Sequence, residues 1–184
     1  MIRHRLFVAL LPPATVRAEL AALARRRLPV RWVPEDNLHL TMRFIGETEP
    51  EKLEKFATSL AHVRVEPFIL PVEGLGVFPT RGPAKVLWAG VGHAHTRLFQ
   101  LRKQVDDALL AVDGGLEMRN FHPHFTLGRL DEAVETKDLE SFLARHTAFE
   151  APPFRVSEFH LMASLPLGEA RTYRSVQTFI LQAT

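Results

Sequence analysis

The chain has 184 residues, of which 46% are hydrophobic and 24% are charged, and its formal net charge is only +2. These values fit one compact globular domain. Because the sequence has no cysteine, disulfides, thiolate catalysis and zinc–cysteine sites are excluded. No apolar run is long enough to cross a membrane, and the N-terminal apolar stretch is too short for a secretion signal. We therefore expect a cytoplasmic protein with no membrane partner, and we expect a monomer.

The basic residues are unevenly divided, with 18 Arg against 5 Lys. Guanidinium groups suit bidentate contacts with phosphate. A GC-rich genome gives the same excess of Arg without any function, so the excess by itself identifies no partner.

The first half of the sequence alternates between strand and helix signals. Val16, Leu20 and Leu23 recur at helical spacing, and Thr48 and Glu51 have the spacing of a capping box before a second helix. The expected elements, in chain order, are a strand over residues 5–10, a helix over 15–28, a strand over 38–45, a helix over 53–60 and a strand over 67–78.

The second half repeats this order of elements. A Gly/Pro-rich turn at residues 78–83 separates the halves. The expected elements are a strand over residues 85–91, a helix over 98–109, a strand over 123–130, a helix near 139–143 and strands over 154–162 and 173–181. We interpret the repetition as an internal duplication within a single domain, with halves of roughly 1–80 and 84–184.

One short pattern occurs in both halves, as His39-Leu40-Thr41-Met42 and as His124-Phe125-Thr126-Leu127. Alternate residues of a strand share a face, so each His and Thr should point one way and the apolar pair the other. A duplicated unit with a pseudo-twofold axis would bring the two strands together. We therefore expect both His/Thr pairs to face one shared cleft.

Two imidazoles and two hydroxyls suit phosphoryl transfer without a metal. A neutral His can take a proton while a protonated His gives one, and both forms exist near neutral pH. Thr hydroxyls can donate hydrogen bonds to phosphate oxygens. The competing interpretation is a metal site at His122 and His124 or at His93 and His95, but no further ligand accompanies either pair. We expect no metal and no cofactor.

The chain resembles the two-histidine (2H) phosphoesterases, and among them the RNA 2′,3′-cyclic phosphodiesterases that are also called 2′-5′ RNA ligases. The resemblance covers almost the whole chain and rests on the stretches RLFVALLPP, RWVPEDNLHLTMRFIGE, GLGVFPTRGPAKVLWAGV, FHPHFTLGRL and LMASLPLGEARTYRSV. It implies an α+β, bilobal fold in which two antiparallel sheets flank a central cleft, with helices on the outside. It also implies hydrolysis of a 2′,3′-cyclic phosphate to a 2′-phosphomonoester, with tRNA fragments or oligonucleotides carrying such ends as the RNA partners.

The resemblance also implies roles for particular residues. His39 matches the family's proton donor and His124 its proton acceptor, while Thr41 and Thr126 match the phosphate-binding threonines.

Two arginines are further candidates for phosphate binding. Arg129 matches a family arginine, but it stands five residues after His124, so it reaches the same face only if the strand twists or bulges. Arg43 stands four residues after His39 and has the correct parity, but Gly128 occupies the equivalent place in the second half. Arg43 is therefore either a phosphate ligand or a solvated charge.

Three functions remain open at this point. The first is the cyclic phosphodiesterase, and the second is a 2′-5′ RNA ligase that uses the same residues in the reverse direction. The third is a module that binds an RNA end without turnover. The sequence does not separate them.

Overall fold

The structure, a computed structural model, describes residues 4–25, 28–93, 96–117, 120–130, 135–167 and 170–183. Its strands are β1 (His4–Leu10), β2 (Val30–Trp32), β3 (Leu40–Thr48), β4 (Phe68–Glu73), β5 (Leu75–Phe78), β6 (Val86–Gly90), β7 (His124–Leu130), β8 (Glu150–Val156), β9 (Glu158–Leu167) and β10 (Ala170–Ile180). Its α-helices are α1 (Ala14–Ala22), α2 (Pro50–Leu60), α3 (Thr96–Val112) and α4 (Thr136–Arg145), and short 3-10 turns lie at Leu23–Arg25 and Glu35–Asn37.

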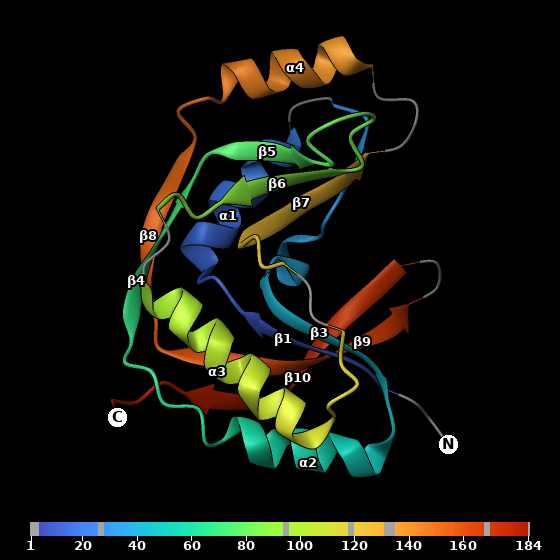
Figure 1. The fold of residues 1–184 in the computed structure, drawn as a ribbon. Coiled ribbons are helices and arrows are strands. Elements are labelled where there is room, and N and C mark those ends of the chain that lie inside the picture. The colour runs from blue at the N-terminus through green and yellow to red at the C-terminus, as the bar shows by residue number, and fades with distance from the viewer. Residues whose placement is uncertain are drawn as a thin grey trace.

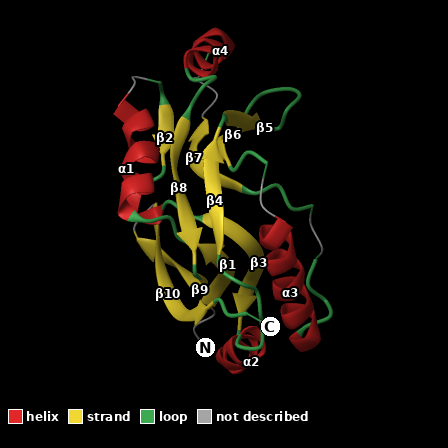
Figure 2. Ribbon diagram, turned by 90° about the vertical axis from the view of Figure 1, so that its left-hand side faces the viewer, coloured by secondary structure: helices red, strands yellow, loops and turns green. Residues whose placement is uncertain are grey.

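The strands form one large sheet and one small one. The large sheet has eight strands in the order β10-β9-β1-β3-β7-β6-β5, with β2 also paired to β7, and β4 pairs with β8 separately. The paired strands run antiparallel. Helices α1–α4 lie on the outside of the strands (Figures 1 and 2). The α+β prediction is confirmed.

The large sheet has two parts that meet at a single residue pair, Leu40 on β3 opposite Phe125 on β7. We call these two residues the junction pair. The two sheets expected from the sequence are thus two parts of one sheet. Strands β2 and β5 join β7 and β6, and strands β9 and β10 join β1, so each half of the chain adds two strands to the other half's part. Figure 1 shows the two parts diverging from the junction.

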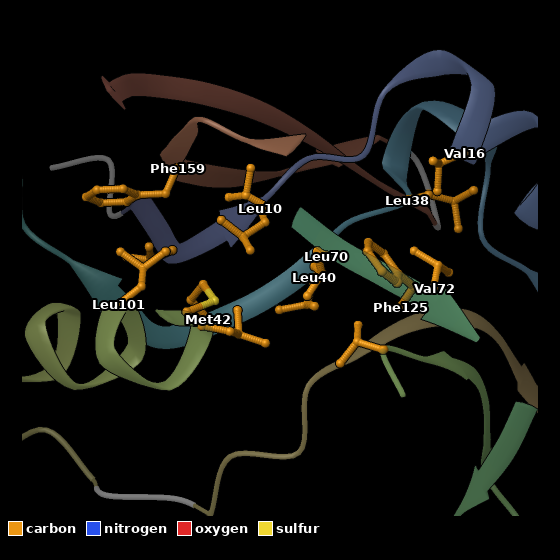
Figure 3. Close-up of a cluster of buried hydrophobic side chains, with 14 of the residues drawn as sticks. Leu10, Val16, Leu38, Leu40, Met42, Leu70, Val72, Leu101, Phe125 and Phe159 are labelled. Carbon is orange, nitrogen blue, oxygen red and sulfur yellow. The ribbon is translucent and has the colours of Figure 1, made fainter. Parts of the chain in front are cut away.

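The hydrophobic core lies on one face of the large sheet. Both residues of the junction pair are fully buried there, packed with Leu70 and Val72 of β4 (Figure 3). The small β4–β8 sheet therefore covers one face of the junction. No helix in the described part of the chain combines the length and apolar character of a membrane span.

Several expected elements differ in detail. The three-residue strand β2 is too short for a periodic signal, and the strand expected over 154–162 breaks at Ser157 into β8 and β9, which join different sheets. The strand expected over 67–78 breaks at Gly74, whose φ of 76° interrupts extended backbone. The capping box is wrong, because Pro50 begins α2 and the Thr48 hydroxyl donates to the Gly46 carbonyl instead.

Replacing Phe125 with Ala should lower the free energy of unfolding by about 3–5 kcal/mol, because it leaves a cavity at the junction beside Phe154. Chemical denaturation measures the change. Ile69→Ala is the control, since that side chain is 53% exposed and its loss should change the free energy by less than about 0.5 kcal/mol. Equal effects of the two substitutions would show that the junction pair does not organise the core.

Candidate active site

The junction pair sets the register of the two motif strands. With Leu40 opposite Phe125, antiparallel pairing places His39 opposite Thr126 and His124 opposite Thr41. The junction pair points into the core, so these four side chains project from the other face, where all are partly buried. The two histidines occupy diagonal corners of the resulting square, a separation of about 7–8 Å between backbones in regular pairing.

His39 is held by a backbone carbonyl and by two aromatic rings. Its Nδ1–H donates to the carbonyl of Asn37 over 2.7 Å. The ring of Tyr173 stands edge-on to the imidazole at 4.9 Å, and the ring of Phe7 lies at 5.0 Å. The Asn37 amide in turn donates to the carbonyl of Arg171 over 2.9 Å, which ties the anchor of His39 to β10.

His124 has the same kind of surroundings in the other part of the sheet. Its Nδ1–H donates to the carbonyl of His122 over 2.6 Å. Phe78 stands edge-on at 5.1 Å, and Trp88 lies at 6.2 Å. The Trp88 ring covers Gly76, where any β-carbon would overlap it. The absence of a side chain at Gly76 therefore lets Trp88 reach its place beside His124.

These two hydrogen bonds fix the tautomer of each imidazole. A carbonyl oxygen only accepts, so Nδ1 must carry the proton in both His39 and His124. The other ring nitrogen, Nε2, is then the atom that gains or loses a proton. In the neutral ring Nε2 is a base, and in the charged ring it is an acid.

The surroundings lower the pKa of both histidines. Burial is the largest cause in each case, and the hydrogen bond to the backbone carbonyl opposes it. Charge on His124 lowers the pKa of His39 further, and charge on His122 does the same for His124. His124 thus acts electrostatically on His39, and the free site favours the neutral forms of both imidazoles.

A bulge at Met42 breaks the alternation of β3. Thr41 pairs with Ala9, but the next paired residue is Arg43, opposite Val8. Directly opposite residues share a face, and the side chain of Val8 is fully buried in the core. Met42 and Arg43 therefore both point into the core, whereas Thr41 remains on the face of His39.

Arg43 thus lies away from the histidines. Its side chain is 3% exposed, and Nη1 lies 3.4 Å from Asp106 Oδ1 on α3. Neither role expected from strict alternation, phosphate ligand or solvated charge, fits this position, and the bulge is the physical reason.

A bulge at Leu127 changes the phase of β7 in the same way. Thr126 pairs with Trp88, and after the bulge Arg129 pairs with Val86. Trp88 and Val86 lie two apart on β6 and share its face. The exposed Arg129 therefore returns to the face of Thr126, as phosphate binding requires.

The residue of β3 that corresponds to Arg129 is Phe44, which sequence reasoning missed. It follows Thr41 by three positions, as Arg129 follows Thr126. Its ring is 58% exposed and lies 6.2 Å from the ring of Phe7. The equal spacing in the sequence could have indicated that Phe44 and Arg129 correspond, but its meaning is clear only when both bulges are known.

The remaining histidines considered as metal ligands are His93, His95 and His122. His122 and His93 are exposed, and the His122 ring lies 6.1 Å from that of Phe78. His95 lies outside the described residues. In the part of the chain that the structure describes, no three or more His, Asp or Glu side chains are grouped to hold a metal ion.

Paired imidazoles, hydroxyls and a guanidinium on one face are the parts of an acid–base phosphoesterase. The family model described as "LigT like Phosphoesterase" matches residues 10–88 and 91–168. The chain therefore belongs to the LigT-like phosphoesterase family, which confirms the resemblance to the two-histidine phosphoesterases.

Curated relatives carry a more specific name. Proteins named RNA 2′,3′-cyclic phosphodiesterase include one from Aeropyrum pernix, 30% identical over 84% of this chain and 88% of its own length. One from Aquifex aeolicus is 31% identical over 82% of this chain and 81% of its own. Among solved structures, apo Escherichia coli LigT matches with a TM-score of 0.80 at 26% identity, over 99% of both chains. TT0787 of Thermus thermophilus also matches with a TM-score of 0.80, at 25% identity over 97% of this chain and 98% of its own.

Titration of the imidazoles by NMR should give a pKa below 6.5 for both His39 and His124, with Nδ1 protonated in the neutral form. Replacing His124 with Gln should raise the pKa of His39, because it removes a repelling charge. His62 is exposed and lies in the turn that follows α2, outside the large sheet. His62→Gln is therefore the control and should leave the pKa of His39 unchanged.

The same shift predicts how stability depends on pH. Because each folded-state pKa lies below 6.5, the unfolded chain binds more protons near pH 6, and stability should fall as the pH drops below 6.5. The His39→Gln/His124→Gln variant should lose part of this fall. An unchanged pH dependence in that variant would contradict the burial of neutral imidazoles.

Proposed function

We propose that this chain is an RNA 2′,3′-cyclic phosphodiesterase, which hydrolyses the cyclic phosphate at an RNA end to a 2′-phosphomonoester. The observation that carries the proposal is the diagonal placement of His39 and His124 across the junction, each with Nδ1 anchored and Nε2 left for proton transfer. A diagonal pair suits an in-line displacement, since the attacking water and the leaving oxygen lie on opposite sides of phosphorus.

His124 acts as the general base and His39 as the general acid. Nε2 of His124 takes a proton from water, and the water oxygen forms a bond to phosphorus. The bond between phosphorus and O3′ breaks, and Nε2–H of His39 gives its proton to O3′. The phosphate remains on O2′. One proton enters His124 and one leaves His39, so the pair is restored by proton exchange with solvent.

The hydroxyls of Thr41 and Thr126 donate hydrogen bonds to the two non-bridging oxygens, and Arg129 adds a charged donor from the rim. Each threonine lies opposite the histidine of the other strand, so each side of the phosphate meets one His and one Thr. Arg43 has no direct role in this scheme, because it is buried on the opposite face.

The comparisons support this assignment. The curated relatives are named for cyclic phosphodiesterase activity on RNA. Solved structures of Escherichia coli LigT include complexes with 3′-AMP and with phosphate. We extend this to the present chain as a site for an RNA end, with tRNA fragments or oligonucleotides as the substrate class.

A dinucleotide ending in a 2′,3′-cyclic phosphate is the substrate that tests the function, with the product identified by phosphorus NMR. Wild type should give a terminal 2′-phosphate. His39→Ala and His124→Ala should each lower kcat by about 10²- to 10⁴-fold, because each removes one proton-transfer group. Thr41→Ala and Thr126→Ala should cost about 1.5–3 kcal/mol of transition-state stabilisation, since each removes one hydrogen bond to a charged group.

The same assay separates the alternatives. A 2′-5′-linked product formed in the presence of a 5′-hydroxyl acceptor would identify the ligase, and binding without turnover would identify the RNA-end module. A 3′-phosphate as sole product would reverse the orientation of the ribose. Activity should persist in EDTA, because the scheme gives every proton transfer to an imidazole.

Replacing Arg129 with Met should raise KM more than it lowers kcat, because a rim guanidinium binds the phosphate in the ground state as well as the transition state. A loss of about 1.5–3 kcal/mol in kcat/KM is expected for one charge-assisted hydrogen bond. Arg155→Met is a control, since Arg155 is an exposed arginine on β8, outside the large sheet. Similar kinetics for the two variants would remove Arg129 from the site.

A further inference from the structure

The two bulges need a hydrogen-bond donor for the carbonyl of the bulged residue, and they obtain it differently. In β7, the carbonyl of Leu127 accepts from the backbone N–H of Val33 over 2.8 Å, just after β2. No strand pairs with β3 on its junction side beyond Leu40 in the described residues. There the carbonyl of Met42 accepts from Nη1 of Arg102 on α3. The bulged carbonyl of β3 thus accepts a hydrogen bond from a side chain, whereas that of β7 accepts one from the backbone of a neighbouring segment.

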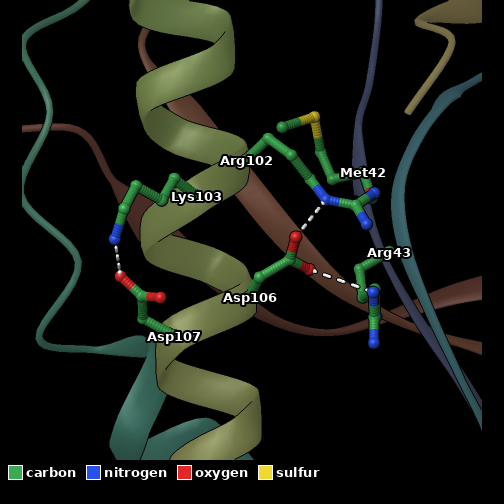
Figure 4. Close-up of polar contacts among 6 residues, drawn as sticks. All are labelled: Met42, Arg43, Arg102, Lys103, Asp106 and Asp107. Carbon is green, nitrogen blue, oxygen red and sulfur yellow. Dashed lines mark hydrogen bonds and ion pairs between the residues drawn. The ribbon is translucent and has the colours of Figure 1, made fainter. Parts of the chain in front are cut away.

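Arg102 is itself held by a buried carboxylate. Its Nε donates to Asp106 Oδ2 over 2.6 Å, one turn along α3, and the other oxygen of Asp106 lies 3.4 Å from Arg43 Nη1 (Figure 4). All three residues are buried, with 3% of Arg43, 9% of Arg102 and 8% of Asp106 exposed. Buried guanidinium groups are costly unless their N–H groups are satisfied. Asp106 therefore fixes the direction in which Arg102 points.

Arg102 also contacts the segment that leads into the second motif. Its guanidinium lies over the ring of Phe121, 4.9 Å from the centroid. Phe121 comes three residues before His124 and directly before His122, whose carbonyl anchors the catalytic imidazole. One side chain of α3 thus touches the backbone of β3 and the approach to β7.

We propose that Arg102, oriented by Asp106, is a positioning residue for the active site. It holds the backbone of β3 at Met42, directly after Thr41, where the bulge turns Arg43 into the core. Arg102 touches no substrate and acts through the backbone of β3. This inference rests on the proposed function for its kinetic test, although the placement of the bulge can be tested without it.

The kinetic test compares Arg102→Met with Lys103→Met on the cyclic-phosphate dinucleotide. Lys103 is the matched control, because it forms an exposed ion pair with Asp107 one turn along the same helix (Figure 4). Misplacement of a binding group by a fraction of an ångström should lower kcat/KM about 10- to 100-fold in Arg102→Met. Lys103→Met should remain within about twofold of wild type, and Arg102→Lys should recover part of the loss because it restores a donor.

A double-mutant cycle shows whether Arg102 acts through Thr41. If it does, Arg102→Met should cost much less in a Thr41→Ala background than in wild type. A loss that is equal in both backgrounds would mean a general effect on folding and would overturn the proposal. Should Arg102→Met fail to fold, Asp106→Asn takes its place in the cycle, with the same two outcomes.

Amide hydrogen exchange at residues 41–44 tests the bulge independently of activity. Exchange there should become faster in Arg102→Met and stay unchanged in Lys103→Met. Slow exchange in both variants would overturn the proposal even if the enzyme is active. If wild type lacks phosphodiesterase activity but exchange responds as expected, the proposed function fails while the structural role of Arg102 stands.

Discussion

The single pairing of Leu40 with Phe125 is the constraint on which the site depends. Because the two parts of the large sheet touch at one point, they diverge on either side of it and leave both motif strands with one face turned away from the core. The register of this pair alone determines which His meets which Thr. Both side chains are completely buried, so the hydrophobic core fixes the geometry of polar groups that lie on the other face.

The two bulges determine which residues after the threonines face the site. A one-residue bulge shifts the phase of every residue after it. Both motif strands bulge at the residue that follows the threonine. The positions after the bulges then differ in chemistry, with Phe44 on one side of the site and Arg129 on the other.

The sequence predicted the parts of this arrangement that rest on periodicity. The helices, the motif strands and the repeated His/Thr pairs follow from spacing, and the family follows from the motifs. The burial of Arg43 on the core face could not be predicted, because strict alternation assumes no bulge. The pairing of β5 with β6 and of β9 with β1, each in the other half of the chain, could not be predicted either. The pattern of buried residues in a strand shows which of its faces is buried, but not which strand lies beside it.

The burial of the two imidazoles affects when each of them carries a proton. Burial lowers the pKa of both His39 and His124, and the pKa of His39 is lowered further by charge on His124, so the free enzyme holds them largely neutral at neutral pH. A phosphodiester carries one negative charge, and placing it between the imidazoles favours a proton on one of them. The acid would then be charged mainly when substrate is bound.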